Sequence, residues 1–152
     1  MVDLYALHAD FPGSEAAASV RNKPYDRVRD LEAAWQRDIQ DSRFIPYLQL
    51  HEYEAYLFSK IDELAFFYPD AEQALDRLTK LADSVKSPEH IDDGRKTAPS
   101  KRIIAELPEY AAAKTTVGPQ AGELIGIAAI RQKCSHFNDW LTCLEQLGDT
   151  RC

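Results

Sequence analysis

The sequence predicts an α/β protein in which a small parallel sheet precedes a mostly helical C-terminal half. Two short segments near the N-terminus have the apolar, branched and aromatic composition of strands, and one amphipathic helical pattern separates them. Every later periodic segment has the spacing of a helix. Because a strand, a helix and a strand in succession form a βαβ unit, we expect the two strands to be parallel.

The N-terminal elements follow in that order. The first strand is expected over residues 2–7, and a loop follows over residues 8–22. Over residues 24–40, apolar side chains recur at spacings of three and four, and the proline at the start suits a first helical position. The second strand is expected over residues 44–50. There Pro46 cannot donate a ladder hydrogen bond, which favours an edge or the start of a strand.

All further segments are expected to be helical, on the evidence of capping residues, prolines and apolar periodicity. The expected helices are 52–58, 70–84, a short one from Ser87, 97–107, one opened by Gly118 and Pro119 and interrupted at Gly126, and 135–147. A sheet of two strands is marginal on its own. Either helices cover it, or further strands lie outside this chain.

The composition is that of one globular domain. The chain has 152 residues, of which 45% are hydrophobic and 28% charged, so it can bury one core of ordinary size. We expect a single domain over residues 1–152, with a βαβ-like part over residues 1–60 and a helical part over residues 61–152. Neither a bilayer-spanning run nor a secretory signal is evident, so we expect a cytoplasmic protein with no membrane partner. No metal or disulfide pattern surrounds the cysteines, and thiols are expected at Cys134, Cys143 and Cys152.

The net charge of −7 argues against a protein that coats nucleic acid over much of its surface, because such binding needs basic charge. One local basic cluster exists, within eight positions that contain no acid: Arg95, Lys96, Lys101 and Arg102. Thr97, Ser100 and the free amides of a helix start could bind phosphate oxygens there, with Lys101 and Arg102 adding charge. The alternative is an ordinary capped helix with solvated basic side chains.

Ligand-type residues stand at the junction between the second strand and the following helix. His51, Glu52 and Glu54 come directly after an apolar run, and ligands usually sit at the carboxyl ends of strands in sheets flanked by helices. Parallel strands could bring Asp3 of the first strand to the same edge. Carboxylates suit Mg²⁺, which activates water and offsets phosphate charge in phosphodiester cleavage. The sequence therefore raises the hypothesis of a magnesium site with Asp3, Glu52 and Glu54 as ligands.

Within this hypothesis Glu54 is the favoured catalytic residue. On a helix the two glutamates would point about 200° apart, so at most one would face the metal. His51 would serve as a hydrogen-bond partner or proton carrier. The structural alternative is that His51 and Glu54 form a hydrogen-bonded pair, while Glu52 stabilises the start of its own helix. A zinc protease is excluded because the second histidine of His-Glu-x-x-His is missing.

Six segments carry a family resemblance that spacing alone does not reveal. They are MVDLYAL (1–7), DFPG (10–13), RFIPYLQLHEYEAYLF (43–58), TAPSKR (97–102), IGI (125–127) and CSHFNDW (134–140). In this order they resemble the C-terminal two-thirds of the bacterial family known as domain of unknown function 4276. The resemblance implies a relative of the TOPRIM fold, the metal-binding α/β domain of topoisomerases, primases and some nucleases. It also implies an ATPase partner encoded nearby in defence-like gene clusters.

The chain departs from that pattern in two places. Family members are longer at the N-terminus, where a TOPRIM-like domain would carry its first strand and a catalytic glutamate. The Asp-x-Asp pattern of TOPRIM domains corresponds here to Asp3-Leu4-Tyr5, so only Asp3 fits. The resemblance therefore implies a component of a Mg²⁺-dependent nuclease, incomplete in this chain, that acts on DNA beside an ATPase. The alternative is a non-catalytic helical module that docks a partner protein through its acidic surface.

Overall fold

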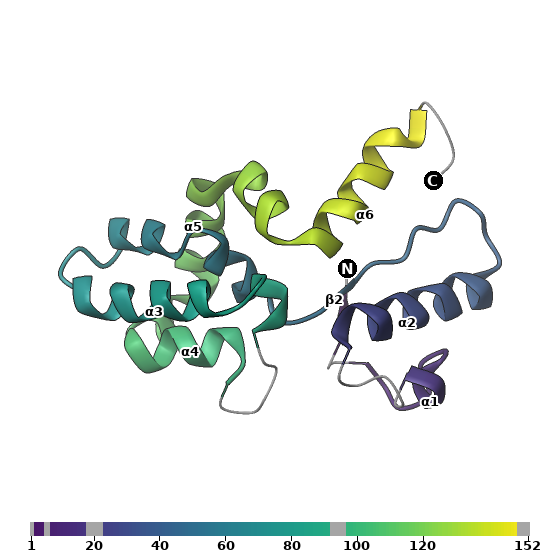
Figure 1. The fold of residues 1–152 in the computed structure, drawn as a ribbon, viewed down its shortest axis with the longest axis horizontal. Helices are drawn as coiled ribbons and strands as arrows, with labels where there is room; N and C mark the ends of the chain where they lie inside the picture. The colour runs from purple at the N-terminus through teal and green to yellow at the C-terminus, as the bar shows by residue number, and fades with distance from the viewer. Residues whose placement is uncertain (1, 5–6, 18–22, 92–96, 149–152) are drawn as a thin grey trace. The chain divides into compact units, whose positions relative to one another are not determined.

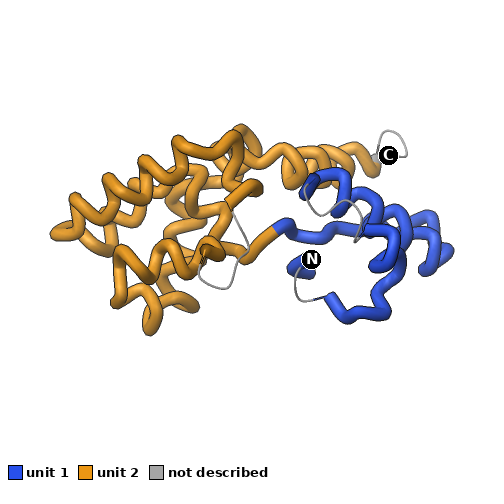
Figure 2. The backbone as a smooth tube through the Cα atoms, turned by 60° about the horizontal axis from the view of Figure 1, so that its bottom comes forward, with its two compact units in different colours: residues 1–50 blue, residues 51–152 orange. Residues whose placement is uncertain are grey.

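A computed structural model describes residues 2–4, 7–17, 23–91 and 97–148 (Figure 1). Within this part the chain is mostly helical with one small parallel sheet, which confirms the predicted fold class. It divides into two compact units, residues 1–50 and residues 51–152, and each is described by itself (Figure 2). The single domain over residues 1–152 stays a prediction.

The first unit contains the expected strand, helix and strand. β1 (Val2–Asp3) and β2 (Leu48–Gln49) pair in parallel, with Val2 opposite Leu48 and Asp3 opposite Gln49. α1 (Ser14–Ala17) and α2 (Pro24–Ile39) come between them along the chain. The unit is therefore a βαβ arrangement with a minimal sheet.

Both strands are shorter than predicted. β2 starts only after Pro46, in keeping with the missing N–H of proline. The Leu48 N–H donates instead to the Glu32 carboxylate of α2, with a distance of 2.7 Å between Leu48 N and Glu32 Oε1. Residues 5 and 6 of the predicted first strand lie outside the described part of the chain. The core of this unit is built from both helices, from β2 and from the residues that follow each strand: Leu4, Ala17, Val28, Leu31, Leu48 and Leu50.

α2 occupies nearly the predicted range. It begins with Pro24, and it ends where Gln40 adopts a left-handed φ of 54°. Trp35 packs edge-on against Phe11 and Phe44, with ring centroids 5.3 and 4.9 Å apart. The apolar face of α2 is thus covered by the chain segments on either side of it.

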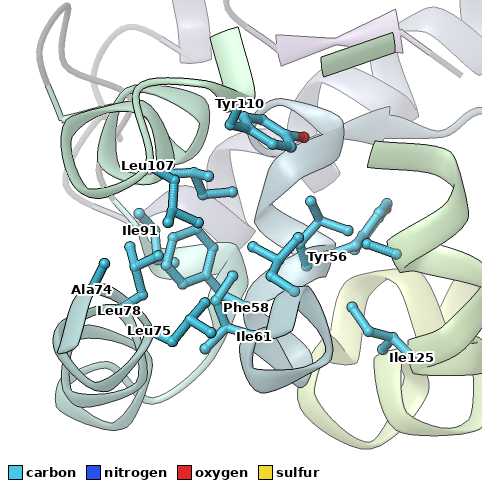
Figure 3. Packing of buried hydrophobic residues seen from close by; sticks show 14 of the residues in the cluster. Tyr56, Phe58, Ile61, Ala74, Leu75, Leu78, Ile91, Leu107, Tyr110 and Ile125 are labelled. Atoms are coloured by element: carbon cyan, nitrogen blue, oxygen red, sulfur yellow. The ribbon is translucent and has the colours of Figure 1, made fainter. Parts of the chain in front are cut away.

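In the described part of the second unit, every regular element is a helix. Its elements are η3 (Tyr53–Ser59), η4 (Ile61–Phe66), α3 (Glu72–Ser84), η5 (Pro88–His90), α4 (Pro99–Glu106), α5 (Tyr110–Lys133), α6 (Ser135–Glu145) and η6 (Gln146–Gly148), of which the η elements are 3₁₀ helices. Side chains of η3 and η4 form the middle of one core, where Phe58 and Ile61 lie beside Leu75 and Leu78 of α3 (Figure 3). Tyr110 at the start of α5 is completely buried in the same cluster.

The predicted helix opening at Gly118 and Pro119 is wrong. α5 already begins at Tyr110 and continues through Pro119. Three alanines follow Tyr110, and alanine has the highest helix propensity. Burial of the tyrosine also anchors this first turn. Together these two effects outweigh the hydrogen bond that is lost at Pro119. The predicted interruption at Gly126 is confirmed, because this residue has φ 76° and ψ 151° inside α5.

The cysteines differ among themselves. Cys134 is a buried free thiol, as predicted. Cys143 is disulfide-bonded, so the prediction of a thiol is wrong for this residue. Cys152 lies outside the described residues.

Candidate functional site

The junction residues His51, Glu52 and Glu54 stand at the start of the second unit. His51 is buried, and its Nε2 lies 3.0 Å from the carbonyl oxygen of Glu89 in η5. Because a carbonyl oxygen can only accept, this contact needs the proton on Nε2. His51 therefore joins the junction to a segment 38 residues further along the chain.

Glu52 caps a helix that is distant in the sequence. Its backbone is extended, with φ −68° and ψ 161°, and its side chain makes no cap hydrogen bond to η3. Instead its Oε2 accepts a hydrogen bond of 3.0 Å from the backbone amide of Ser100, in the first turn of α4. A carboxylate at this place satisfies a free amide and complements the helix dipole. The prediction that Glu52 stabilises the start of its own helix through the dipole stays a prediction, and the contact with Ser100 comes in addition to it.

Glu54 is buried against α5. Its Oε1 accepts a hydrogen bond from the Tyr110 hydroxyl at 3.3 Å and lies 3.1 Å from Nζ of Lys114. Only 3% of the Glu54 side chain is exposed, whereas 41% of Lys114 is, so the ion pair reaches from the core to the surface. Burial, followed by the charge of Glu54, raises the pKa of Tyr110 far above its ordinary value. The tyrosine therefore remains a neutral donor to the carboxylate.

The two glutamates consequently engage different elements, Glu52 at α4 and Glu54 at α5. The alternative hypothesis predicted a hydrogen bond between His51 and Glu54. In the structure His51 contacts η5 and Glu54 contacts α5. Asp3 belongs to the first unit, so the shared metal site of Asp3, Glu52 and Glu54 stays a prediction. In the described part of the chain, no group of three or more His, Cys, Asp or Glu side chains could hold a metal ion.

The predicted phosphate contacts surround the same start of α4. Ser100 is buried and its amide is bonded to Glu52, so a phosphate at this amide would meet a carboxylate. Arg102 Nε donates to the Thr97 carbonyl oxygen at 3.0 Å, and Lys101 is exposed. Arg95 and Lys96 of the basic cluster lie outside the described residues. The phosphate contacts stay a prediction, and the observed hydrogen bonds fit a capped helix.

Glu89 is the organising residue that sequence reasoning missed. It is 3% exposed, and its two oxygens accept hydrogen bonds from the first turn of α6, at 3.1 Å from His136 N and 3.0 Å from Phe137 N. The pattern Ser87-Pro88-Glu89 indicated only an acid at the start of its own short helix. Nothing in the local sequence signals a cap for a helix that starts more than 40 residues later.

The same region encloses the free thiol of Cys134. Burial, followed by the negative charge of Glu89, raises the pKa of Cys134 to about 12. Its Sγ lies 3.6 Å from Oγ of Ser59, an interaction that partly opposes this rise. The thiol therefore stays protonated at neutral pH and lacks the reactivity of a nucleophilic cysteine.

The fold and the junction define a mostly helical α/β protein whose buried carboxylates connect distant helices. Residues 1–145 match the family model described as Domain of unknown function (DUF4276), and the chain belongs to this family, as the six segments predicted. Comparisons with curated proteins and with solved structures give no significant match. Among the helices of the described part, none has the length and apolar character needed to cross a membrane.

Proposed function

We propose that the helical unit of this chain is a non-catalytic module that docks a partner protein. The observation that carries this proposal is the use of both junction carboxylates within the fold: Glu52 is bonded to Ser100, and Glu54 to Tyr110 and Lys114. Glu54 is buried and Glu52 is half-buried, and these contacts hold the two carboxylates on different elements, which disfavours their meeting at one metal ion.

The docking face that we propose lies at the break of α5. Leu124 is 44% exposed and Ile127 is 60% exposed, on either side of Gly126 in the chain. Exposed Glu123 is adjacent to Leu124, and the whole chain carries a net charge of −7. An apolar contact beside an acidic side chain suits a partner with an apolar patch and a basic group at its edge.

The partner that we propose is an ATPase encoded beside this protein, as the family resemblance implies. The test is co-expression with that ATPase, followed by a binding measurement on the purified pair. Leu124→Ser combined with Ile127→Ser is expected to weaken binding by about tenfold or more, because apolar interface side chains contribute strongly at the centre of a contact. Ile39→Ser is the matched control, since Ile39 is 47% exposed at the end of α2 in the first unit.

Equal weakening by the double variant and by the control would remove α5 as the docking face. Absence of binding between the wild-type chain and the ATPase would remove the proposed partner. Circular dichroism on each variant would confirm that the helices are retained, so that a loss of binding is not a loss of folding.

The second candidate is a component of a Mg²⁺-dependent nuclease that acts on DNA. One observation favours it: β1 and β2 are parallel, and Asp3 stands opposite Gln49, shortly before His51. The observed partners of Glu52 and Glu54 do not suit a single metal ion, because the two carboxylates engage different helices. Any magnesium site would therefore need these contacts to rearrange.

A magnesium titration with a DNA cleavage assay separates the two candidates. It would use this chain and, in parallel, any in-frame extension upstream of Met1, where the TOPRIM resemblance expects a further glutamate. The docking proposal predicts no metal-dependent cleavage by either form. Cleavage that requires magnesium and is abolished by both Asp3→Asn and Glu54→Gln in a folded protein would establish the nuclease instead.

A further inference from the structure

A polar cavity of about 240 Å³ lies in the second unit, away from the junction carboxylates. Four parts of the chain line it: residues 58–62, where η3 meets η4; Thr79, Ala82 and Asp83 in α3; residues 85–88 after α3; and Lys133 at the end of α5. The convergence of such separate segments makes this a feature of the tertiary structure.

Three lysines line the cavity, although the chain as a whole is acidic. Lys60 forms an ion pair with Glu63. Lys86 and Lys133 are exposed, and neither has an ion-pair partner in the part of the chain that the structure describes. Asp62 and Asp83 also line the cavity, and because Lys60 is paired with Glu63, these two carboxylates balance the formal charge of Lys86 and Lys133.

Hydroxyl groups complete the lining. Ser87 is buried, and its Oγ accepts a hydrogen bond of 3.1 Å from the Glu89 amide, so its own proton remains available for a ligand. Thr79 provides a second hydroxyl on the α3 side. Ammonium and hydroxyl donors together match the oxygens of a phosphate group, which accepts several charge-assisted hydrogen bonds.

The ordinary explanation for Lys86 and Lys133 is that each complements the C-terminal end of a helix, because one follows α3 and the other ends α5. That explanation accounts for each lysine separately. It does not account for their meeting at one cavity beside the hydroxyl of Ser87. A phosphate there could accept hydrogen bonds from both ammonium groups.

We propose that this cavity binds a phosphate group, with Lys86 and Lys133 as its charged contacts and Ser87 as a hydrogen-bond donor. Drug-sized ligands occupy cavities of roughly 300–1,000 Å³, so this smaller cavity suits one phosphate with a small attached group. The proposal does not depend on the docking function or on the junction carboxylates.

The test is an NMR titration of the full chain with inorganic phosphate and with a 5′-phosphorylated mononucleotide, up to about 10 mM. Amide shifts are expected at residues 85–88 and at Lys133. Lys86→Gln combined with Lys133→Gln is expected to weaken binding by about tenfold. Lys80→Gln combined with Lys23→Gln removes the same charge from lysines that do not line the cavity, and it should leave binding within about twofold.

A short single-stranded oligonucleotide provides a second arm, which distinguishes the source of the phosphate. Shifts at the cavity with the mononucleotide identify a small phosphorylated ligand, and shifts there with the oligonucleotide alone identify a nucleic-acid backbone. No shifts at the cavity with any probe would overturn the proposal. Equal weakening by the two double variants would also overturn it, since this would indicate a general effect of charge.

Discussion

The carboxylate of Glu52 accepts a hydrogen bond from the backbone amide of Ser100, 48 residues further along the chain. This bond connects the entry of the helical unit to the first turn of α4. It also occupies an amide at which a phosphate was one of the two predicted partners. One contact thus bears on the metal hypothesis and on the phosphate hypothesis, and it makes Glu52 the first residue to vary.

Glu52→Ala is expected to destabilise the chain by about 1 kcal/mol, the usual cost of removing a helix cap. Glu52→Gln should cost less, because the amide oxygen can still accept from Ser100. Urea unfolding measures both, with Glu123→Ala as the control at an exposed position of α5. If Glu52→Ala and Glu123→Ala unfold at the same urea concentration, the cap contributes nothing.

Glu89→Ala is expected to loosen α6 selectively. It removes both acceptors from the amides of His136 and Phe137 and leaves these buried donors unsatisfied, at a cost of roughly 1–3 kcal/mol. Amide hydrogen exchange should then show reduced protection at the start of α6, with smaller changes in α3. A uniform loss of protection over the whole helical unit would contradict a local capping role.

Gly122→Ala is expected to be destabilising because of Tyr53. A Cβ at this position would stand 2.0 Å from the Tyr53 hydroxyl oxygen and 3.2 Å from Cζ, so the ring must move. Overpacking of this kind typically costs about 1–3 kcal/mol. Tyr53→Phe removes the nearest atom, and the double variant should recover part of the loss in thermal unfolding.

Gly126→Ala is the comparison for that experiment. A Cβ there would meet nothing within 4 Å, but the φ of 76° is unfavourable for alanine and costs roughly 1–2 kcal/mol. Tyr53→Phe should leave this second loss unchanged. Rescue of both glycine variants by Tyr53→Phe would show that contact with the tyrosine is not the cause.

Stability is expected to fall as the pH rises above 9, through Cys134. Its pKa is about 12 in the folded chain, compared with an ordinary value of 9.0. The folded state therefore keeps the thiol proton while the unfolded state releases it, so the stabilisation is complete below pH 9 and declines as the pH rises from 9 toward 12. Each group of this kind contributes at most about 1.4 kcal/mol per pH unit.

Chemical unfolding at pH 8 and at pH 10 measures this effect. Cys134→Ala should show a smaller loss between the two pH values than the wild-type chain. Tyr110, whose pKa is also raised, adds to the decline in both proteins only above its ordinary value of 10.0. An equal loss in the two proteins would mean that the thiol does not carry the effect.

Local periodicity identified most helices and the βαβ order. α2, α3 and α4 lie within or close to their predicted ranges, because apolar spacing, prolines and capping residues act over a few neighbouring positions. The early start of α5 escaped prediction. Its first turn is held by the buried Tyr110, and burial of a single tyrosine is not visible in a local pattern.

The candidate site was predictable in position but not in its contacts. The sequence located His51, Glu52 and Glu54 where a strand gives way to a helix, and the structure has them at that junction. Local sequence patterns did not indicate that Glu89 caps α6 or that Lys86 and Lys133 line one cavity. These relationships join residues that are 47 or 48 positions apart, which no local pattern connects.

The sequence by itself therefore determined the fold class, the order of the elements and membership of the family, because these depend on composition, periodicity and ordered motifs. Only the tertiary structure decided how the carboxylates are used. A glutamate has the same chemistry whether it binds a metal or caps a helix, and the choice depends on which amide or hydroxyl the folded chain brings within hydrogen-bond distance. For Glu52 that group is the amide of Ser100, and for Glu54 it is the hydroxyl of Tyr110.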